Sequence, residues 1–213
     1  MPPSVALTFD DGPWPEGTLR LLDVLAQRDV RATFFVWGKQ ASAHPDVVRQ
    51  TIEAGHSVQP HCWEHTSHGD MTPHQIQSDI DAVMALLREL GAAPSHLWRP
   101  PWGQWLWGAT RKLASERGLE LAGWTIDTAD FCGHAATTMH EAVVAELDAA
   151  ARNAADAVVL MHDSPLEAGQ WAKRHDVSET VELVRRLVAD ESRCFIPLAH
   201  GLWDNLMLVT PPR

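Results

Sequence analysis

The sequence is poor in cysteine, and its cysteines form no recognisable pattern. Cys62, Cys132 and Cys194 are scattered over 213 residues, with no Cys-x-x-Cys pair and an odd total. This spacing argues against a disulfide framework. A reducing compartment is therefore the simpler expectation.

Long apolar segments and leader-like features are also missing. No apolar run is long enough to cross a bilayer. The first core-like segment begins at Val5, and no basic region followed by an apolar stretch precedes it. We therefore expect a cytoplasmic protein without a membrane partner, or an extracellular one if a leader has been removed from this chain.

Positive charge is scarce. The chain has 17 Lys and Arg against 28 Asp and Glu, which gives a formal net charge of -11 at pH 7. Nucleic acids and anionic membranes are poor partners for such a chain, because like charges repel. Neutral or cationic substrates fit better, and the composition predicts no particular oligomeric state.

Tyrosine is absent, whereas tryptophan is abundant. Five of the ten tryptophans fall within one stretch: Trp98, Trp102, Trp105, Trp107 and Trp124. Core packing is the better explanation for any single tryptophan. Trp102, Trp105 and Trp107, however, lie in a Pro/Gly-rich segment typical of a surface loop. That cluster predicts a stacking wall for a ligand ring.

What the sequence does contain is a strand–helix alternation in a chain that is 45% hydrophobic, which fits one domain over residues 1–213. Strands are expected at 5–9, 32–37, 97–99, 119–124, 157–161 and 195–198. Helices are expected at 17–28, 45–54, 73–90, 109–117, 138–154 and 177–189. The helix over 73–90 has the clearest signal, because Thr72 and Gln75 form a capping box before an apolar stripe. The alternation predicts parallel strands in an open doubly wound sheet or a barrel.

Polar clusters follow the predicted strands and extended segments. Each lies at the C-terminal end of one of them: Asp10-Asp11, His61, Arg99, Asp127 to Asp130, and His162. Residues placed there converge on one face of an α/β fold and are typical of catalytic groups. Each motif alone also has a structural explanation, such as an Asp-rich turn, a capping histidine or a surface ion pair.

A metal site is the most specific chemistry that these clusters suggest. His61 and His65, at i and i+4, share a face if the stretch is helical, and the spacing suits two zinc–nitrogen bonds. In a chain with 12 histidines, two surface histidines explain the pair alone equally well. Side chains alternate along a strand, so one of Asp10 and Asp11 can bind metal while the other handles a proton. Two His and one Asp, with positions open for water, describe a catalytic metal site.

Together the motifs resemble the NodB-homology polysaccharide deacetylase family, carbohydrate esterase family 4. The resemblance covers about residues 5–198 and includes five motifs in order: Thr8-Phe9-Asp10-Asp11-Gly12, Gly55-His56-Ser57 leading to His61 and His65, Arg99-Pro100-Pro101-Trp102-Gly103, Asp127 to Phe131, and Leu160-Met161-His162. It implies an α/β fold, a distorted (β/α)7-type barrel. Asp11, His61 and His65 would hold a divalent metal, usually Zn²⁺, with Co²⁺ or Ni²⁺ as alternatives.

The resemblance also implies the other roles. Asp10 would be the general base, and His162 the general acid with Asp130 tuning it. Arg99 would orient either Asp10 or Asp130. The backbone N–H of Trp102 would help bind the oxyanion, while Leu160 and Phe131 would shape the acyl pocket and Trp105 would join the aromatic wall.

The expected function is a metal-dependent hydrolase that removes an N-acyl group, usually acetyl, from an amino sugar. A small soluble substrate is favoured here because no leader is visible, with peptidoglycan or chitin oligomers close behind. A deformylase or a cyclic-imide or ureide hydrolase would use the same metal site. A catalytically inactive sugar-binding module ranks lowest, because Asp10, His162 and the three metal residues are all present.

Several positions depart from the family pattern. Cys62 replaces a usual Ser or Thr, Pro60 a common Asn, Trp102 a usual Tyr and Phe131 a usual Trp. Trp63-Glu64 is reminiscent of the deformylase branch that acts on lipid-linked aminoarabinose. These changes reshape the pocket, so they bear on the substrate rather than on the chemistry.

Overall fold

The computed structural model describes residues 3–103, 108–165 and 175–198. Its strands are β1 (Ser4–Asp10), β2 (Thr33–Trp37), β3 (Ser57–Cys62), β4 (Leu97–Trp98), β5 (Glu120–Leu121), β6 (Ile126–Asp127), β7 (Ala157–His162) and β8 (Cys194–Phe195). Its α-helices are α1 (Pro15–Ala26), α2 (Gly38–Ala43), α3 (Pro45–Glu53), α4 (Pro73–Glu89), α5 (Gly108–Glu116), α6 (Ala136–Arg152) and α7 (Val177–Leu187). Short 3₁₀ turns η1 (His68–Asp70), η2 (Pro101–Gly103) and η3 (Asp130–Cys132) complete the set.

The strands form one large parallel sheet and one small one. The large sheet has the order β3-β2-β1-β7-β6, and β8 pairs with the beginning of β1. β4 and β5 pair with each other. The side-chain oxygen of Gln59 on β3 accepts hydrogen bonds from the backbone N–H groups of His96 and Leu97 at 3.2 and 3.1 Å, and this joins the small sheet to the large one. The expected α/β fold with a distorted barrel is thereby confirmed.

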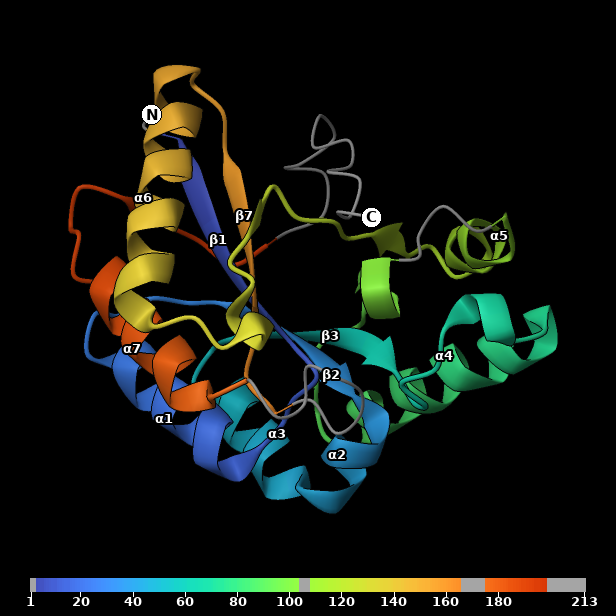
Figure 1. Ribbon diagram of the computed structural model, residues 1–213. Coiled ribbons are helices and arrows are strands. Elements are labelled where there is room, and N and C mark those ends of the chain that lie inside the picture. The colour runs from blue at the N-terminus through green and yellow to red at the C-terminus, as the bar shows by residue number, and fades with distance from the viewer. Residues whose placement is uncertain (1–2, 104–107, 166–174, 199–213) are drawn as a thin grey trace.

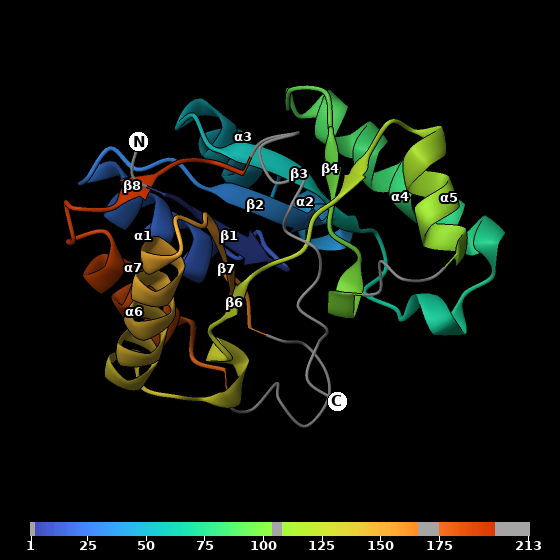
Figure 2. The ribbon, with the colours of Figure 1, turned by 90° about the horizontal axis from the view of Figure 1, so that it is seen from above.

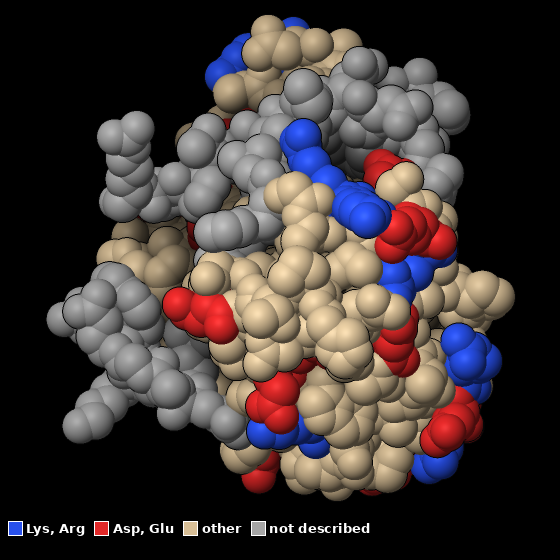
Figure 3. All heavy atoms as spheres, turned by 90° about the vertical axis from the view of Figure 1, so that its right-hand side faces the viewer, with Lys and Arg blue, Asp and Glu red and all other residues tan. Residues whose placement is uncertain are grey.

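The helices cover the outside of this curved sheet. Figures 1 and 2 show α1, α6 and α7 on one side of the central strands β1 and β7, and α4 and α5 at the opposite end of the molecule. On the face that carries α4 and α5, acidic and basic side chains are interspersed rather than gathered by sign (Figure 3). No helix in the described part of the chain is long and apolar enough to cross a membrane.

Strand alternation divides the apolar side chains into two clusters. Val5, Leu7 and Phe9 of β1 pack in the larger cluster, between sheet and helices. The intervening positions of β1 and β7 face the interior of the barrel, where a smaller cluster contains Ala6, Phe35, Leu97, Ala122, Trp124, Val158, Leu160 and Leu198. Because side chains alternate with a period of two, the last residues of these strands, Asp10 and His162, continue the interior face.

Most helices begin and end within two residues of their predicted bounds. The capping box is confirmed: the Thr72 hydroxyl accepts from the Gln75 N–H at 3.3 Å, and the Gln75 side chain accepts from the Thr72 N–H at 2.8 Å. β3 and α2 lack the apolar periodicity that reveals other elements, and were not expected as a strand and a helix. The strand expected over 119–124 is shorter, because only Glu120 and Leu121 pair with β4.

Candidate active site

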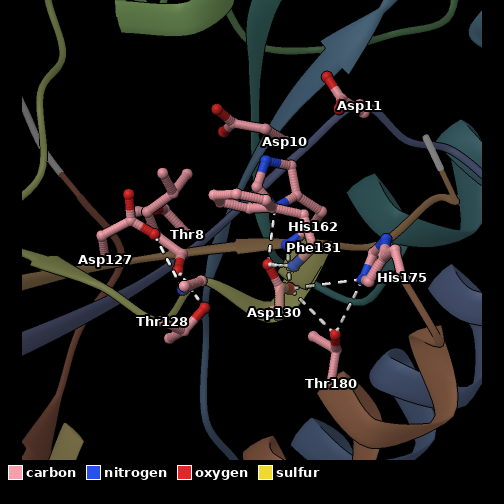
Figure 4. A network of polar contacts seen from close by, with 12 residues as sticks. Thr8, Asp10, Asp11, Asp127, Thr128, Asp130, Phe131, His162, His175 and Thr180 are labelled. Atoms are coloured by element: carbon pink, nitrogen blue, oxygen red, sulfur yellow. Dashed lines mark hydrogen bonds and ion pairs between the residues drawn. The ribbon is translucent and has the colours of Figure 1, made fainter. Parts of the chain in front are cut away.

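Asp10 and Asp11 lie where β1 ends, and the backbone turns sharply between them. Asp11 has a φ of 76°, a left-handed conformation that is costly for a residue other than glycine. The next residue must be glycine, because a Cβ on Gly12 would lie 2.0 Å from an oxygen of Asp163. The two carboxylates therefore leave the strand in different directions (Figure 4).

Asp11, His61 and His65 form a compact group of metal-ligand atoms. The Nε2 atoms of His61 and His65 each lie 3.2 Å from Oδ1 of Asp11. One ligand atom from each residue lies within 4.8 Å of the others. Oδ1 of Asp11 is buried and has no hydrogen-bond partner among the described residues, as expected for an atom that binds a cation. Two imidazoles and one carboxylate fit a divalent metal.

His61 and His65 would share a face if their stretch were helical, and it is not. His61 belongs to β3, and His65 lies in the irregular segment that follows. The two rings nevertheless stack, with centroids 5.4 Å apart. The two imidazoles therefore come together without a helix, and their role as metal ligands stays a prediction.

The charges of this group suit a cation. Burial raises the pKa of Asp11, but His65 and His61 outweigh it and hold that pKa well below the ordinary value, so the carboxylate is anionic. Burial, and then the neighbouring Asp11 and Asp79, raise the pKa of the Cys62 thiol. Cys62 is therefore a neutral thiol in the metal-free protein.

Arg99 contacts Asp10, which decides between its two expected partners. Nη1 of Arg99 donates to Oδ1 of Asp10 and to the Thr8 hydroxyl, both at 2.8 Å. Its other nitrogens donate to the carbonyl oxygens of Ala122 and Gly123 at 3.3 and 2.8 Å. The guanidinium thereby holds one carboxylate oxygen of Asp10 and leaves the other, Oδ2, 4.0 Å from Nδ1 of His61.

The guanidinium of Arg99 is completely buried, which requires such pairing. Its side chain is 0% exposed and lies over the Phe35 ring, 4.2 Å from the ring centroid. Burial lowers the pKa of Arg99, and the adjacent Asp10 opposes that shift. An unpaired buried charge would be strongly destabilising. Arg99 and Asp10 are thus held as a unit inside the barrel.

His162 is bound to Asp130 through both its ring and its backbone. Nδ1 of His162 lies 2.8 Å from Oδ1 of Asp130, and the His162 N–H donates to Oδ2 at 2.8 Å. Figure 4 shows His162 between Asp130 on one side and Asp10 on the other. Burial lowers the pKa of His162, but Asp130, then Asp11 and Asp10, raise it to about 10. His162 is therefore protonated at neutral pH in the metal-free protein.

His175 and Thr180 extend this network, and the sequence analysis missed both. The Thr180 hydroxyl donates to Oδ2 of Asp130 at 2.9 Å and lies 3.2 Å from Nε2 of His175 (Figure 4). Because the hydroxyl proton goes to Asp130, Nε2 of His175 must be the donor in its contact with Thr180. Thr180 lies in the first turn of α7, outside every motif, so no sequence signal pointed to it.

The predicted substrate-binding residues lie around these groups. The Trp102 ring is 4.6 Å from that of His65 and is 53% exposed, and the Phe131 ring is 5.7 Å from that of His162. Leu160 is buried in the interior cluster. Trp105 lies outside the described residues. The roles of all four residues stay predictions.

Comparisons with known proteins place most of the chain beside carbohydrate deacetylases and esterases. Residues 1–122 match the family described as polysaccharide deacetylase. A chitooligosaccharide deacetylase from Bradyrhizobium sp. is 33% identical over 186 residues, which cover 86% of this chain and 81% of that protein. A family 4 carbohydrate esterase from Streptomyces lividans, solved in complex with acetate, superposes with a TM-score of 0.74 at 27% identity and covers 91% of each chain.

A peptidoglycan-N-acetylglucosamine deacetylase from Bacillus cereus is 33% identical over 162 residues, or 76% of this chain. The matched part spans 56% of the length of that relative.

Proposed function

Because the chain belongs to the polysaccharide deacetylase family, we propose that it hydrolyses the N-acetyl group of an amino sugar within a glycan. One observation carries the proposal. Asp10 and His162 are paired residues of neighbouring strands, and they lie beside the Asp11, His61 and His65 group. A base, an acid and a metal site are thus assembled at one end of the barrel. The named activities of the relatives favour peptidoglycan or chitooligosaccharides over the small soluble amino sugar first expected.

Asp11, His61 and His65 would hold the metal, with Zn²⁺ the first choice and Co²⁺ or Ni²⁺ as alternatives. When bound, such an ion supplies a Lewis acid for the acyl oxygen and lowers the pKa of water.

Asp10 accepts a proton from the attacking water. Arg99 holds Asp10 from the side of the barrel interior, because its Nη1 donates to Oδ1 of Asp10 and also to the Thr8 hydroxyl. Oδ2 is the oxygen that remains oriented toward His61. The water oxygen forms a bond to the acyl carbon, and the backbone N–H of Trp102 stabilises the charge that develops on the acyl oxygen.

His162 completes the reaction by protonating the leaving nitrogen. Its Nδ1 donates to Asp130, so that Nε2 is free to face the substrate. The C–N bond breaks as His162 transfers its proton, because an amine anion is too poor a leaving group to depart unaided. The products are acetate and the free amino sugar.

Acid release from the purified, metal-loaded protein tests the proposal. Acetate and formate are quantified over chitooligosaccharides, peptidoglycan fragments and small N-acyl amino sugars. We expect acetate from the glycans, and a loss of about 10²–10⁴-fold in Asp10→Asn. Because this substitution leaves the buried Arg99 with a neutral partner, activity and metal content are compared at a temperature at which circular dichroism shows the variant to be folded. Asp81→Asn is the matched control, because Asp81 is an exposed carboxylate bound to Arg117.

Other outcomes have distinct meanings. Formate would indicate a deformylase with the same catalytic residues. If no acid were released from any substrate, the remaining explanations would be an imide or ureide hydrolase and a binding module. Full activity of Asp10→Asn would exclude Asp10 as the base.

A further inference from the structure

The chain leaves regular structure between the two metal histidines. β3 ends at Cys62, and residues 63–67 belong to no helix or strand. We call residues 62–64, between His61 and His65, the histidine loop. Buried backbone N–H and C=O groups require partners, and outside secondary structure those partners must come from side chains or water. What fixes the histidine loop also fixes the separation of the two metal ligands.

Asp79 of α4 binds two consecutive backbone amides of this loop. Its Oδ2 accepts from the Trp63 N–H and its Oδ1 accepts from the Glu64 N–H, both at 2.6 Å. Both carboxylate oxygens are thus used on adjacent peptide groups. Hydrogen bonds to an ionised acceptor are roughly twice as strong as those between neutral groups.

The position of Asp79 is an unusual one for a charged side chain. It is 7% exposed and lies on the buried stripe of α4 with Ile76, Ile80 and Val83. Burial raises the pKa of Asp79, and the N–H groups of Glu64 and Trp63 oppose that shift. A carboxylate in an apolar stripe is unfavourable unless its hydrogen bonds compensate. An acidic residue on the apolar face of a predicted helix indicates a buried polar contact, and the sequence analysis did not use this signal.

Two indole groups hold the same backbone at its carbonyl oxygens. Nε1 of Trp37 donates to the Trp63 carbonyl at 2.8 Å, and Nε1 of Trp98 donates to the His61 carbonyl at 2.9 Å. Side chains from β2, β4 and α4 therefore form hydrogen bonds to successive peptide groups between the two histidines. The Trp37 ring also lies beside His65, with centroids 5.5 Å apart.

We propose that Asp79 is a positioning residue for the metal site, acting through the two amides of the histidine loop. It sets the path of the chain from His61 to His65 and so brings both Nε2 atoms to Oδ1 of Asp11. Asp79 itself binds the loop amides rather than the ion. The inference rests on the proposed metal site, which supplies the ligand whose affinity it concerns.

Asp79→Asn is the informative substitution because it keeps the size of the side chain. An amide has one acceptor oxygen, and its NH₂ group would face a backbone N–H, so one of the two bonds is lost and two donors oppose each other. Asp81→Asn is the matched control. Asp81 lies on the same helix, is 49% exposed and pairs with Arg117, so its removal changes the net charge equally without touching the loop.

The test measures the Zn²⁺ dissociation constant of the chelator-treated protein by competition with a chromophoric chelator, without substrate. We expect Asp79→Asn to weaken binding by about 10–100-fold, the range seen when outer-shell partners of metal ligands are removed. Asp81→Asn should bind as the wild type does. Hydrogen exchange of the Trp63 and Glu64 amides in the metal-free protein should accelerate in Asp79→Asn and stay slow in Asp81→Asn.

Unchanged affinity or unchanged amide exchange in a folded Asp79→Asn would overturn the proposal. If that variant does not fold, Asp79→Glu is measured instead, because its extra methylene displaces both carboxylate oxygens. A wild-type Zn²⁺ affinity in Asp79→Glu would also overturn the proposal. Failure of the proposed function is a separate result. A wild-type protein that binds none of Zn²⁺, Co²⁺ and Ni²⁺ refutes the metal site, while slow amide exchange at Trp63 and Glu64 still reports the Asp79 contacts.

Discussion

A buried carboxyl group lies directly behind the turn that carries Asp11. Asp163 is 1% exposed and accepts a hydrogen bond from the Thr18 hydroxyl at 2.6 Å. Its Oδ1 has no hydrogen-bond partner among the described residues. Burial raises the pKa of Asp163 from 3.8 to about 7, with Thr18 opposing and Asp11 contributing to the shift. Asp163 is therefore neutral in mildly acidic solution.

Asp163→Asn should change how stability depends on pH. A carboxyl group with a raised folded pKa contributes stability fully below its unfolded pKa of 3.8, and that contribution is lost as pH rises to about 7. Asparagine resembles the neutral acid and does not ionise. The free energy of unfolding of the variant should therefore rise relative to that of the wild type between pH 4 and 7. The difference is at most about 4 kcal/mol, at 1.36 kcal/mol per pKa unit.

Urea unfolding at several pH values measures this difference. A chelator keeps the protein metal-free at every pH, so that pH-dependent metal release does not contribute. Asp81→Asn is the control, because the Arg117 hydrogen bond lowers the pKa of the exposed Asp81. Parallel stability curves for Asp163→Asn and the wild type would contradict the assignment.

At the residue scale, the sequence predicted which side chains gather but not all of their contacts. Asp10, Asp11, His61 and His162 were singled out because each follows a strand or extended segment. His65 was singled out by its i, i+4 spacing from His61. The partner of Arg99 was left open, since the alternation of a strand gives the face of a residue and not its neighbour across the barrel. Asp79 and Thr180 were missed because each acts from a helix that an apolar pattern already explained.

At the scale of the element, α4 depends on its N-terminal capping box. Thr72→Ala removes the acceptor for the Gln75 N–H and should lower the free energy of unfolding by about 1 kcal/mol. Denaturant unfolding measures the change, and Thr72→Ser, which keeps the hydroxyl, should lose much less. Equal losses in the two variants would mean that the capping hydrogen bond contributes nothing.

The first turn of α7 brings Thr180 to Asp130. Thr180→Val keeps the shape but removes the donor to Oδ2 of Asp130, and hydrogen bonds to charged groups are worth about 1.5–3 kcal/mol. We expect a loss of stability in that range and slower turnover, because Asp130 then holds His162 less firmly. Thr180→Ser should retain both properties, and a serine variant as impaired as the valine variant would argue against the hydroxyl as the cause.

Helices were easier to predict than strands, for a physical reason. α3 and α4 begin at Pro45 and Pro73, where proline marks the first turn, and their apolar stripes persist over several turns. β3 contains Gln59, Pro60 and His61, so its inward positions are polar and give no apolar alternation. Strands that build a polar site lose the pattern by which strands are recognised.

At the scale of the whole molecule, metal binding should stabilise the fold. An ion that binds the native state adds RT ln(1 + [L]/Kd), or about 2.7 kcal/mol at a hundredfold excess over Kd. Zn²⁺ added to chelator-treated protein should raise Tm, and His65→Ala should abolish most of the rise. A Tm that is indifferent to every divalent ion tested would exclude the metal site.

The barrel could be predicted only through the family resemblance. Strand–helix alternation left an open sheet and a barrel equally allowed, because the choice depends on contacts such as that of Gln59 with the small sheet. A single glutamine between two strands has no recognisable sequence pattern.

The direct pairing of Asp10 with His162 sets limits on the reactions that the barrel can support. The proposed base and the proposed acid lie on neighbouring strands, whose backbones are about 4.8 Å apart in a hydrogen-bonded parallel ladder. This spacing suits the attack of water and the departure of a leaving group at the same carbon. The same spacing serves a leaving nitrogen and a leaving oxygen. An O-acetyl ester should therefore also be cleaved, and replacing His162 with asparagine should slow the ester less than the amide, since an alkoxide needs less help to leave.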